Sequence, residues 1–187
     1  MKTEVRSQKS EVRICKPDPR TLNPDAFRVL PVNRQKTLKV DLVAIRKLAE
    51  FFLGKSAQRA GLRWGEVSVV LVDDRKSQEI NRAALGHDYP TDVISFNFAP
   101  LPGEDPTACN GEIVVNAEMA LRLGGRYGGV HRELALYLAH GCDHLSGADD
   151  ATPAERMTMR RRELRWLKEA EKREVRVRGS GLRTHAS

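Results

Sequence analysis

Cysteine is scarce in this chain of 187 residues, which contains only Cys15, Cys109 and Cys142. The three are odd in number and widely spaced, so they form neither a disulfide framework nor a CxxC metal site. A reducing compartment suits such a protein. We therefore predict a cytoplasmic location.

Long apolar runs are also lacking. The longest candidates, residues 67–72 and 134–139, fall well short of the roughly 18 to 20 residues that a membrane-spanning helix needs. Residues 1–6 have none of the apolar character of a secretory signal. These absences predict a protein without a membrane partner.

Basic residues, by contrast, are in excess. The chain has 32 Lys and Arg against 25 Asp and Glu, which gives a formal net charge of +7. Such an excess attracts polyanions through electrostatic steering and counterion release, so nucleic acid is the partner class to consider. The alternative is that the charge belongs to solvated ends, because basic residues crowd both ends of the chain.

Composition predicts one folded unit between two polar ends. Residues 1–25 mix Lys, Arg, Ser and Pro without apolar periodicity, which predicts a flexible basic arm. Residues 174–187 are expected to form a flexible tail. Residues 26–173 then make up one domain, and a hydrophobic content of 40% is sufficient for its core.

Local patterns predict both strands and helices in this domain. Apolar and β-branched residues predict strands at residues 27–32, 66–72, 92–98 and 112–116. Helical periodicity and capping residues predict helices at residues 40–60, 73–84, 117–126, 131–145 and 153–172. Because strands and helices do not alternate regularly, we predict an α+β fold.

A metal-ligand pattern begins at His140 and reads HGCDHLSGADD. Two histidines four residues apart on a helix, here His140 and His144, lie on one face and can reach one cation. Gly147 is placed to end the helix in a left-handed conformation. The chain can then turn back and deliver Asp149 or Asp150 as third ligand, which leaves one zinc position for water and hence for catalysis.

Each of these residues also has an ordinary interpretation. Two histidines at helical spacing can be half-buried, hydrogen-bonded side chains, and Gly-Ala-Asp-Asp is typical of an ordinary helix end. Gly147 and Asp150 at these offsets favour the metal site. Glu133 lies seven residues before His140 on nearly the same helical stripe. It is either a residue that orients a ligand or holds a water, or a solvated charge.

The pattern HxxxHxxGxxD resembles the long zinc motif of metzincin-type proteases. Those enzymes need a glutamate directly after the first histidine as general base, and this chain has Gly141 there. A histidine followed by glycine is similar instead to HGxLHLxGYDH, the signature of the YbeY family of metal-dependent endoribonucleases, also called rRNA maturation factors. The matching residues are His140, Gly141, His144, Leu145, Gly147 and Asp149.

Further blocks in the same order support this resemblance. Asn81 and the run GHDYPTDVISFNF at residues 86–98 are similar to the family's N...RGKDYPTDVLSFPF, and GEIVV at residues 111–115 is similar to its GDIVI strand. With weaker matches at residues 67–81 and 160–167, the resemblance covers residues 27–170.

The resemblance implies a mixed β-sheet of about four strands, packed with helices, beside a metzincin-like metal-binding helix. It implies a zinc-dependent single-strand endoribonuclease of rRNA maturation and ribosome quality control, with rRNA and the small ribosomal subunit as partners. Metal-bound water would hydrolyse an RNA phosphodiester or assist its cleavage. His140, His144 and Asp150 are the implied metal ligands.

Two departures from the family pattern affect the expected chemistry. The family's third ligand is a histidine, and a carboxylate at Asp150 lowers the Lewis acidity of zinc and favours a harder ion such as Mn²⁺. Leu85 replaces a loop arginine, so Arg82 or His87 would have to supply the phosphate contact. The alternative function is therefore a catalytically weakened RNA-binding ribosome-assembly factor, with a metalloprotease less favoured.

Asp143 stands where the family has an apolar residue, beside the ligand face of the helix. It is a candidate base, or a partner of a ligand. The other interpretation is a solvent-facing carboxylate. With Arg82 and His87, it completes the set of candidate catalytic residues.

Overall fold

A computed structural model of the chain describes residues 27–99, 102–103, 108–126, 128–173 and 175. The predicted arm at residues 1–25 lies outside the described residues. So does the predicted tail at residues 174–187, apart from Val175.

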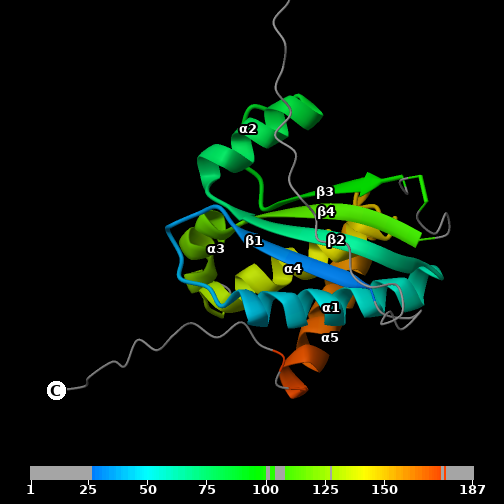
Figure 1. Cartoon of the computed structure of the whole chain (residues 1–187). Helices are drawn as coiled ribbons and strands as arrows, with labels where there is room; N and C mark the ends of the chain where they lie inside the picture. The colour runs from blue at the N-terminus through cyan, green and yellow to red at the C-terminus, as the bar shows by residue number, and fades with distance from the viewer. Residues whose placement is uncertain (1–26, 100–101, 104–107, 127, 174, 176–187) are drawn as a thin grey trace, which may run out of the picture.

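The fold is built on a four-stranded sheet with strand order β1-β2-β4-β3 (Figure 1). The strands are β1 (Arg28–Asn33), β2 (Arg63–Val72), β3 (Val93–Phe98) and β4 (Ala108–Asn116). β1 pairs with β2 and β2 with β4 in parallel, whereas β3 pairs with β4 antiparallel. The predicted α+β fold with a mixed sheet of four strands is confirmed.

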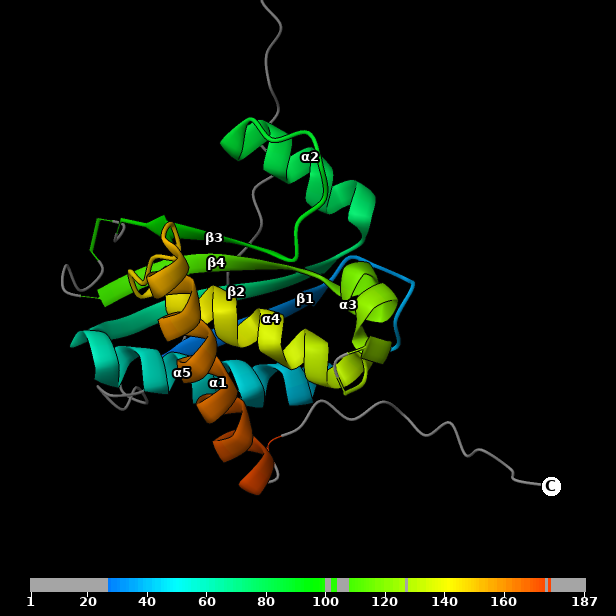
Figure 2. The same ribbon diagram turned by 180° about the vertical axis from the view of Figure 1, so that it is seen from behind.

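Helices lie on both sides of this sheet (Figures 1 and 2). α1 (Leu42–Ala60), α4 (Val130–Leu145) and α5 (Pro153–Lys172) gather on one side. α2 (Asp74–Leu85) lies on the other, and α3 (Ala117–Leu123) follows β4 and leads into the 3-10 turn η2 (Gly124–Arg126). None of the described helices has the length and apolar character needed to span a bilayer.

The main core lies between the sheet and α4. Leu134, Leu136 and Leu138 of α4 are all fully buried, and so are Phe52 of α1 and Ile113 of β4. Helix α4 is covered by the sheet, by α1 and by α5, so its position is held from several sides. A site built on α4 therefore stands on a rigid element.

Three of the predicted boundaries differ from the structure by three or more residues. β2 and β4 begin earlier than predicted, at Arg63 and Ala108, because the two strands pair there with each other across a bulge. Such pairing depends on the neighbouring strand and leaves no local pattern. The helix expected at residues 117–126 ends at Leu123 and continues as a 3-10 turn, since Gly124 and Gly125 disfavour an α-helix.

Candidate metal centre

Helix α4 places His140 and His144 side by side, one turn apart. Their Nε2 atoms are 3.1 Å apart. Asp150, from the loop after α4, has one carboxylate oxygen 3.9 Å from Nε2 of His140 and the other 3.8 Å from Nε2 of His144. The three side chains thus form a group, called the metal group below, whose ligand atoms could all reach one metal ion.

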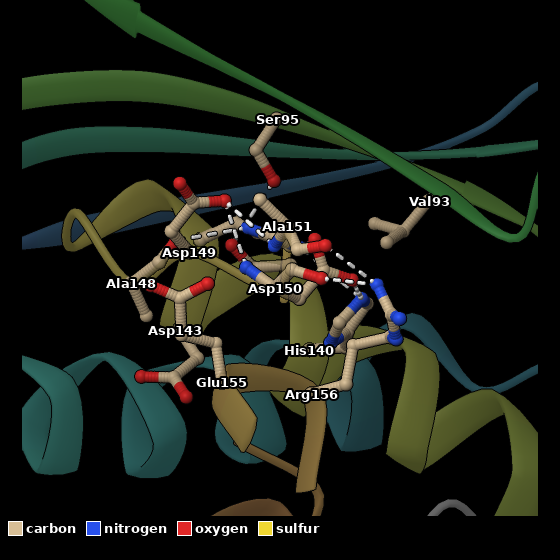
Figure 3. A network of polar contacts seen from close by, with 12 residues as sticks. Val93, Ser95, His140, Asp143, Ala148, Asp149, Asp150, Ala151, Glu155 and Arg156 are labelled. Atoms are coloured by element: carbon tan, nitrogen blue, oxygen red, sulfur yellow. Dashed lines mark hydrogen bonds and ion pairs between the residues drawn. The ribbon is translucent and has the colours of Figure 1, made fainter. Parts of the chain in front are cut away.

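The loop after α4 decides which aspartate reaches the histidines. Gly147 has a φ of 81°, and this left-handed residue reverses the chain as predicted. The Asp149 carboxylate accepts hydrogen bonds from the backbone amides of Asp150 at 2.8 Å and Ala151 at 3.2 Å. Arg156 donates to the carbonyl oxygens of the same two residues (Figure 3). Asp149 therefore shapes the loop, and Asp150 is the aspartate of the group.

The other ring nitrogen of each histidine already has an acceptor. Nδ1 of His140 lies 2.6 Å from a carboxylate oxygen of Glu163, and Nδ1 of His144 lies 3.0 Å from the carbonyl oxygen of Ala148. These acceptors place the ring proton on Nδ1 and leave the Nε2 lone pairs of both rings for a cation. Two such lone pairs 3.1 Å apart repel each other unless a cation or proton lies between them.

The spacing of the three donors fits zinc. Zn–N and Zn–O bonds of about 2.0–2.2 Å at tetrahedral angles separate two ligand atoms by roughly 3.3 Å. The separations in the structure run from 3.1 to 3.9 Å. His140, His144 and Asp150 could therefore hold a tetrahedral ion with small side-chain movements and one position left open.

Glu163 on α5 was missed by the sequence analysis. Its side chain is 2% exposed and reaches His140 across the α4–α5 interface. Burial is the largest single influence on the pKa of His140 and lowers it. The hydrogen bond to Glu163 and the charges of Glu163, Asp92 and Asp150 together outweigh burial and hold that pKa above its ordinary value. The available signal was the position of Glu163 on the buried stripe of α5, together with Met159 and Trp166.

A pocket of about 500 Å³ lies beside His140 and Asp150. Met119, Leu123 and Leu136 contribute apolar side chains to its lining, and two basic residues of α5 line it as well. The complete set of lining residues is Asp92, Met119, Leu123, Glu133, Leu136, Tyr137, His140, Asp150, Arg156, Arg160 and Glu163. Sequence analysis did not anticipate that Asp92, Arg156 and Arg160 would meet here.

Glu133 is a buried residue in the lining of this pocket. Its side chain is 5% exposed, so the interpretation as a solvated charge is wrong. Burial and the adjacent Glu133 carboxylate, which hydrogen-bonds the phenol, raise the pKa of Tyr137. The second carboxylate oxygen of Glu133, Oε2, is buried and has no hydrogen-bond partner within the described part of the chain.

Asp143 lies in a buried ion-pair cluster. Its carboxylate accepts hydrogen bonds from Nε of Arg162 at 2.7 Å and pairs with Nε of Arg59 at 3.3 Å. Burial raises the pKa of Asp143, and the two arginines oppose that shift. The solvent-facing interpretation is wrong because the side chain is fully buried. Asp143 does not line the pocket beside His140, and its contacts tie α4 to α5 and α1.

The contacts that the structure shows for Arg82 and His87 do not involve the histidine pair. Arg82 pairs with Asp88 at 3.4 Å, and both side chains are 62% exposed. The ring of His87 stacks on Tyr89, with centroids 5.4 Å apart. Neither side chain lines the pocket at His140, and Leu85 is 56% exposed. The described contacts thus bring none of these three residues to the metal group.

Close packing against the sheet explains why a glycine, Gly141, follows the first histidine. A Cβ atom at this position would lie 2.5 Å from Cγ2 of Ile113 and 2.8 Å from Cγ2 of Val93. The hydroxyl of Ser95 donates to the Gly141 carbonyl oxygen at 3.0 Å. Figure 3 shows Val93 and Ser95 of β3 above the loop that carries Asp150. Helix α4 therefore approaches the sheet more closely than any side chain would allow.

Comparison with known proteins identifies the family of the chain. Residues 31–171 match the family model described as "Endoribonuclease YbeY". The chain belongs to the YbeY endoribonuclease family. The resemblance inferred from the HGxLHLxGYDH signature and the TDVISFNF block is confirmed, and no helix pattern alone would have distinguished this family from the metzincins.

Two YbeY relatives illustrate the extent of the similarity. Endoribonuclease YbeY of Elusimicrobium minutum is 42% identical over 118 residues, which cover 61% of this chain and 82% of the relative. Endoribonuclease YbeY of Rhodopirellula baltica is 39% identical over 107 residues, 56% of this chain and about half (53%) of the relative's length. The solution structure of TM1509 from Thermotoga maritima has a TM-score of 0.49 at 21% identity and covers 85% of this chain and 99% of its own.

Proposed function

We propose that this protein is a zinc-dependent single-strand endoribonuclease whose metal ligands are His140, His144 and Asp150. The observation that carries the proposal is the convergence of two Nε2 atoms and one carboxylate beside a pocket that basic residues also line. Family membership supports the RNA substrate. When bound, a divalent cation supplies a Lewis acid for the phosphodiester and makes water a better nucleophile.

Neighbouring residues hold the proposed metal ligands in position. Glu163 fixes the ring of His140, and the Ala148 carbonyl fixes the ring of His144. Arg156 holds the Asp150 loop through two carbonyl oxygens. Arg160 lines the pocket and forms no ion pair with another of the described residues. Its guanidinium is suited to bind a phosphate oxygen of RNA, the role that Leu85 does not fill.

The charge of the pocket supports metal dependence of RNA binding itself. Four carboxylates and two guanidinium groups line it, a formal charge of minus two with neutral histidines. A phosphodiester would be repelled by that wall, whereas one divalent cation brings the formal charge to zero. The acids are Asp92, Glu133, Asp150 and Glu163, and the bases are Arg156 and Arg160.

We further propose that the substrate is rRNA and that the small ribosomal subunit is a partner, in rRNA maturation and ribosome quality control. The resemblance implies this role, and the net charge of +7 supports a polyanionic partner. A catalytically weakened assembly factor is the second candidate, because Leu85 and Asp150 both depart from the family pattern.

The deciding experiment compares wild type with His144→Ala. Purified protein is analysed for bound metal, stripped with a chelator, reloaded with Zn²⁺ or Mn²⁺, and incubated with single-stranded rRNA fragments. We expect cleavage by the reloaded wild type and none by His144→Ala. Equal cleavage by the two proteins would reject a metal-dependent nuclease, and metal-dependent RNA binding without turnover would favour the assembly factor.

The matched variant Asp150→His tests the choice of metal. It restores the histidine of the family signature, so the activity with Zn²⁺ should rise relative to the activity with Mn²⁺. The same Zn²⁺ to Mn²⁺ activity ratio in wild type and Asp150→His would show that the carboxylate does not set the preference.

A further inference from the structure

A buried carboxylate oxygen without a partner lies in the wall of the pocket. Glu133 is 5% exposed, and its Oε2 atom has no hydrogen-bond partner among the residues that the structure describes. Leaving a buried acceptor unpaired costs free energy, so such groups in native proteins call for an explanation. The partner that satisfies a carboxylate oxygen is a hydrogen-bond donor supplied by water or by a ligand.

The pocket has the chemistry of a nucleotide-binding site. Its volume of about 500 Å³ lies in the usual range for small-molecule sites. Met119, Leu123 and Leu136 form an apolar wall suited to the face of a base. Arg160 lines the same pocket as His140 and Asp150, and these groups would hold a phosphate.

The position of Glu133 on α4 decides which part of a nucleotide it meets. Glu133 and His140 are seven residues apart on one helix, about two turns, which separates them by roughly 10 Å along the axis. A ribose 2′-hydroxyl lies only a few covalent bonds from its phosphate and does not span that length. The exocyclic amine on the far edge of a base does.

We infer that this pocket binds the nucleotide next to the scissile phosphate and that Glu133 accepts a hydrogen bond from the exocyclic amine of its base. The inference rests on the proposed function and adds its specificity-determining residue. A carboxylate accepts from the N4 amine of cytosine but repels the O4 carbonyl oxygen of uracil. Cytosine and uracil have the same ring size, so the apolar wall does not distinguish them.

The test uses zinc-loaded protein with oligo-C and oligo-U of equal length. Binding is measured by fluorescence anisotropy at one fixed salt concentration, and cleavage of the same RNAs is followed on gels. We expect wild type to bind oligo-C about tenfold more tightly than oligo-U, the effect of one hydrogen bond to a charged group. Glu133→Gln should bring that ratio close to one, because a carboxamide can either accept or donate.

Arg160→Ala is the matched control. It removes a phosphate contact, so it should weaken oligo-C and oligo-U alike and leave their ratio unchanged. A purely structural role of Glu133 would also lower both affinities together. Thermal unfolding shows whether each variant is folded, and the ratio measured on wild type tests the inference even if Glu133→Gln does not fold.

The outcomes separate this inference from the proposed function. Binding and cleavage of both RNAs with no preference in wild type would overturn the inference alone, with water as the partner of Glu133. A preference that survives in Glu133→Gln would overturn the role of that residue. If neither RNA is bound or cleaved, the proposed function fails, and the inference fails with it.

Discussion

The Glu163 carboxylate on α5 lies 2.6 Å from Nδ1 of His140 on α4. This contact orients one proposed metal ligand from a helix that contributes no proposed ligand itself. We predict that Glu163→Gln lowers the affinity for zinc by about 10- to 100-fold, the usual effect of losing such a carboxylate partner. A competition titration with a zinc-binding dye measures it.

The pH dependence of this loss of zinc affinity shows whether Glu163 acts on His140 through its charge or only through packing. In the metal-free protein Glu163 raises the pKa of His140, so protons compete with the metal as the pH falls. Glu163→Gln lowers this pKa and weakens the competition. The loss of affinity should be full at high pH, where His140 is unprotonated in both proteins, and smaller at low pH. A loss that is constant with pH would indicate packing alone.

The buried cluster at Asp143 should contribute to stability and not to chemistry. Asp143→Ala leaves Arg59 and Arg162 without their shared carboxylate. We expect a loss of about 2–3 kcal/mol in the free energy of unfolding, below the figure for fully buried pairs because both arginines keep some contact with water. Urea denaturation measures the change.

Asp88→Ala is the control for Asp143→Ala, since it breaks the exposed pair with Arg82 and should change stability little. Asp143→Ala should also retain metal binding and RNA cleavage per folded molecule. Unchanged stability with lost cleavage would restore Asp143 as a catalytic candidate.

Gly141 is predicted to be intolerant of any side chain. Gly141→Ala places a methyl group against Ile113 and Val93, and α4 must move away from the sheet. We expect a loss of about 1–3 kcal/mol, typical of overpacking, together with weaker zinc binding because His140 moves with the helix. Thermal unfolding and zinc titration measure the two effects.

Gly54 of α1 provides the matched control for Gly141. A Cβ atom there meets nothing within 4 Å, so Gly54→Ala should stabilise the protein by about 0.5–1 kcal/mol. Equal effects of the two substitutions would contradict the close approach of α4 to the sheet.

Arg160 is predicted to replace the missing loop arginine. Arg160→Ala should weaken RNA binding and reduce the slope of log affinity against log salt concentration by about 0.7, the value for one phosphate contact on a single strand. Arg82→Ala and His87→Ala should leave both quantities nearly unchanged, because neither side chain lines the pocket. A larger effect at Arg82 would place the phosphate contact in the loop after α2.

Local patterns were sufficient for much of the fold. The apolar and β-branched runs predicted all four strands, and Pro153 as a first-turn residue marked the start of α5. The pairing of His140 with His144 also follows from sequence alone, because residues four apart share one helix face. Family blocks such as TDVISFNF also predicted that the strands form a mixed sheet, because strand direction cannot be inferred from periodicity.

Contacts across space decided the rest. Whether Asp149 or Asp150 faces the histidines depended on a loop whose hydrogen bonds no pattern encodes. Glu163 meets His140 only because α5 folds back over α4, and the same packing buries Asp143 between arginines. The sequence alone therefore determined that His140 and His144 share one helix face, through helical periodicity. Only the tertiary structure determined their partners, because those partners come from other elements of the fold.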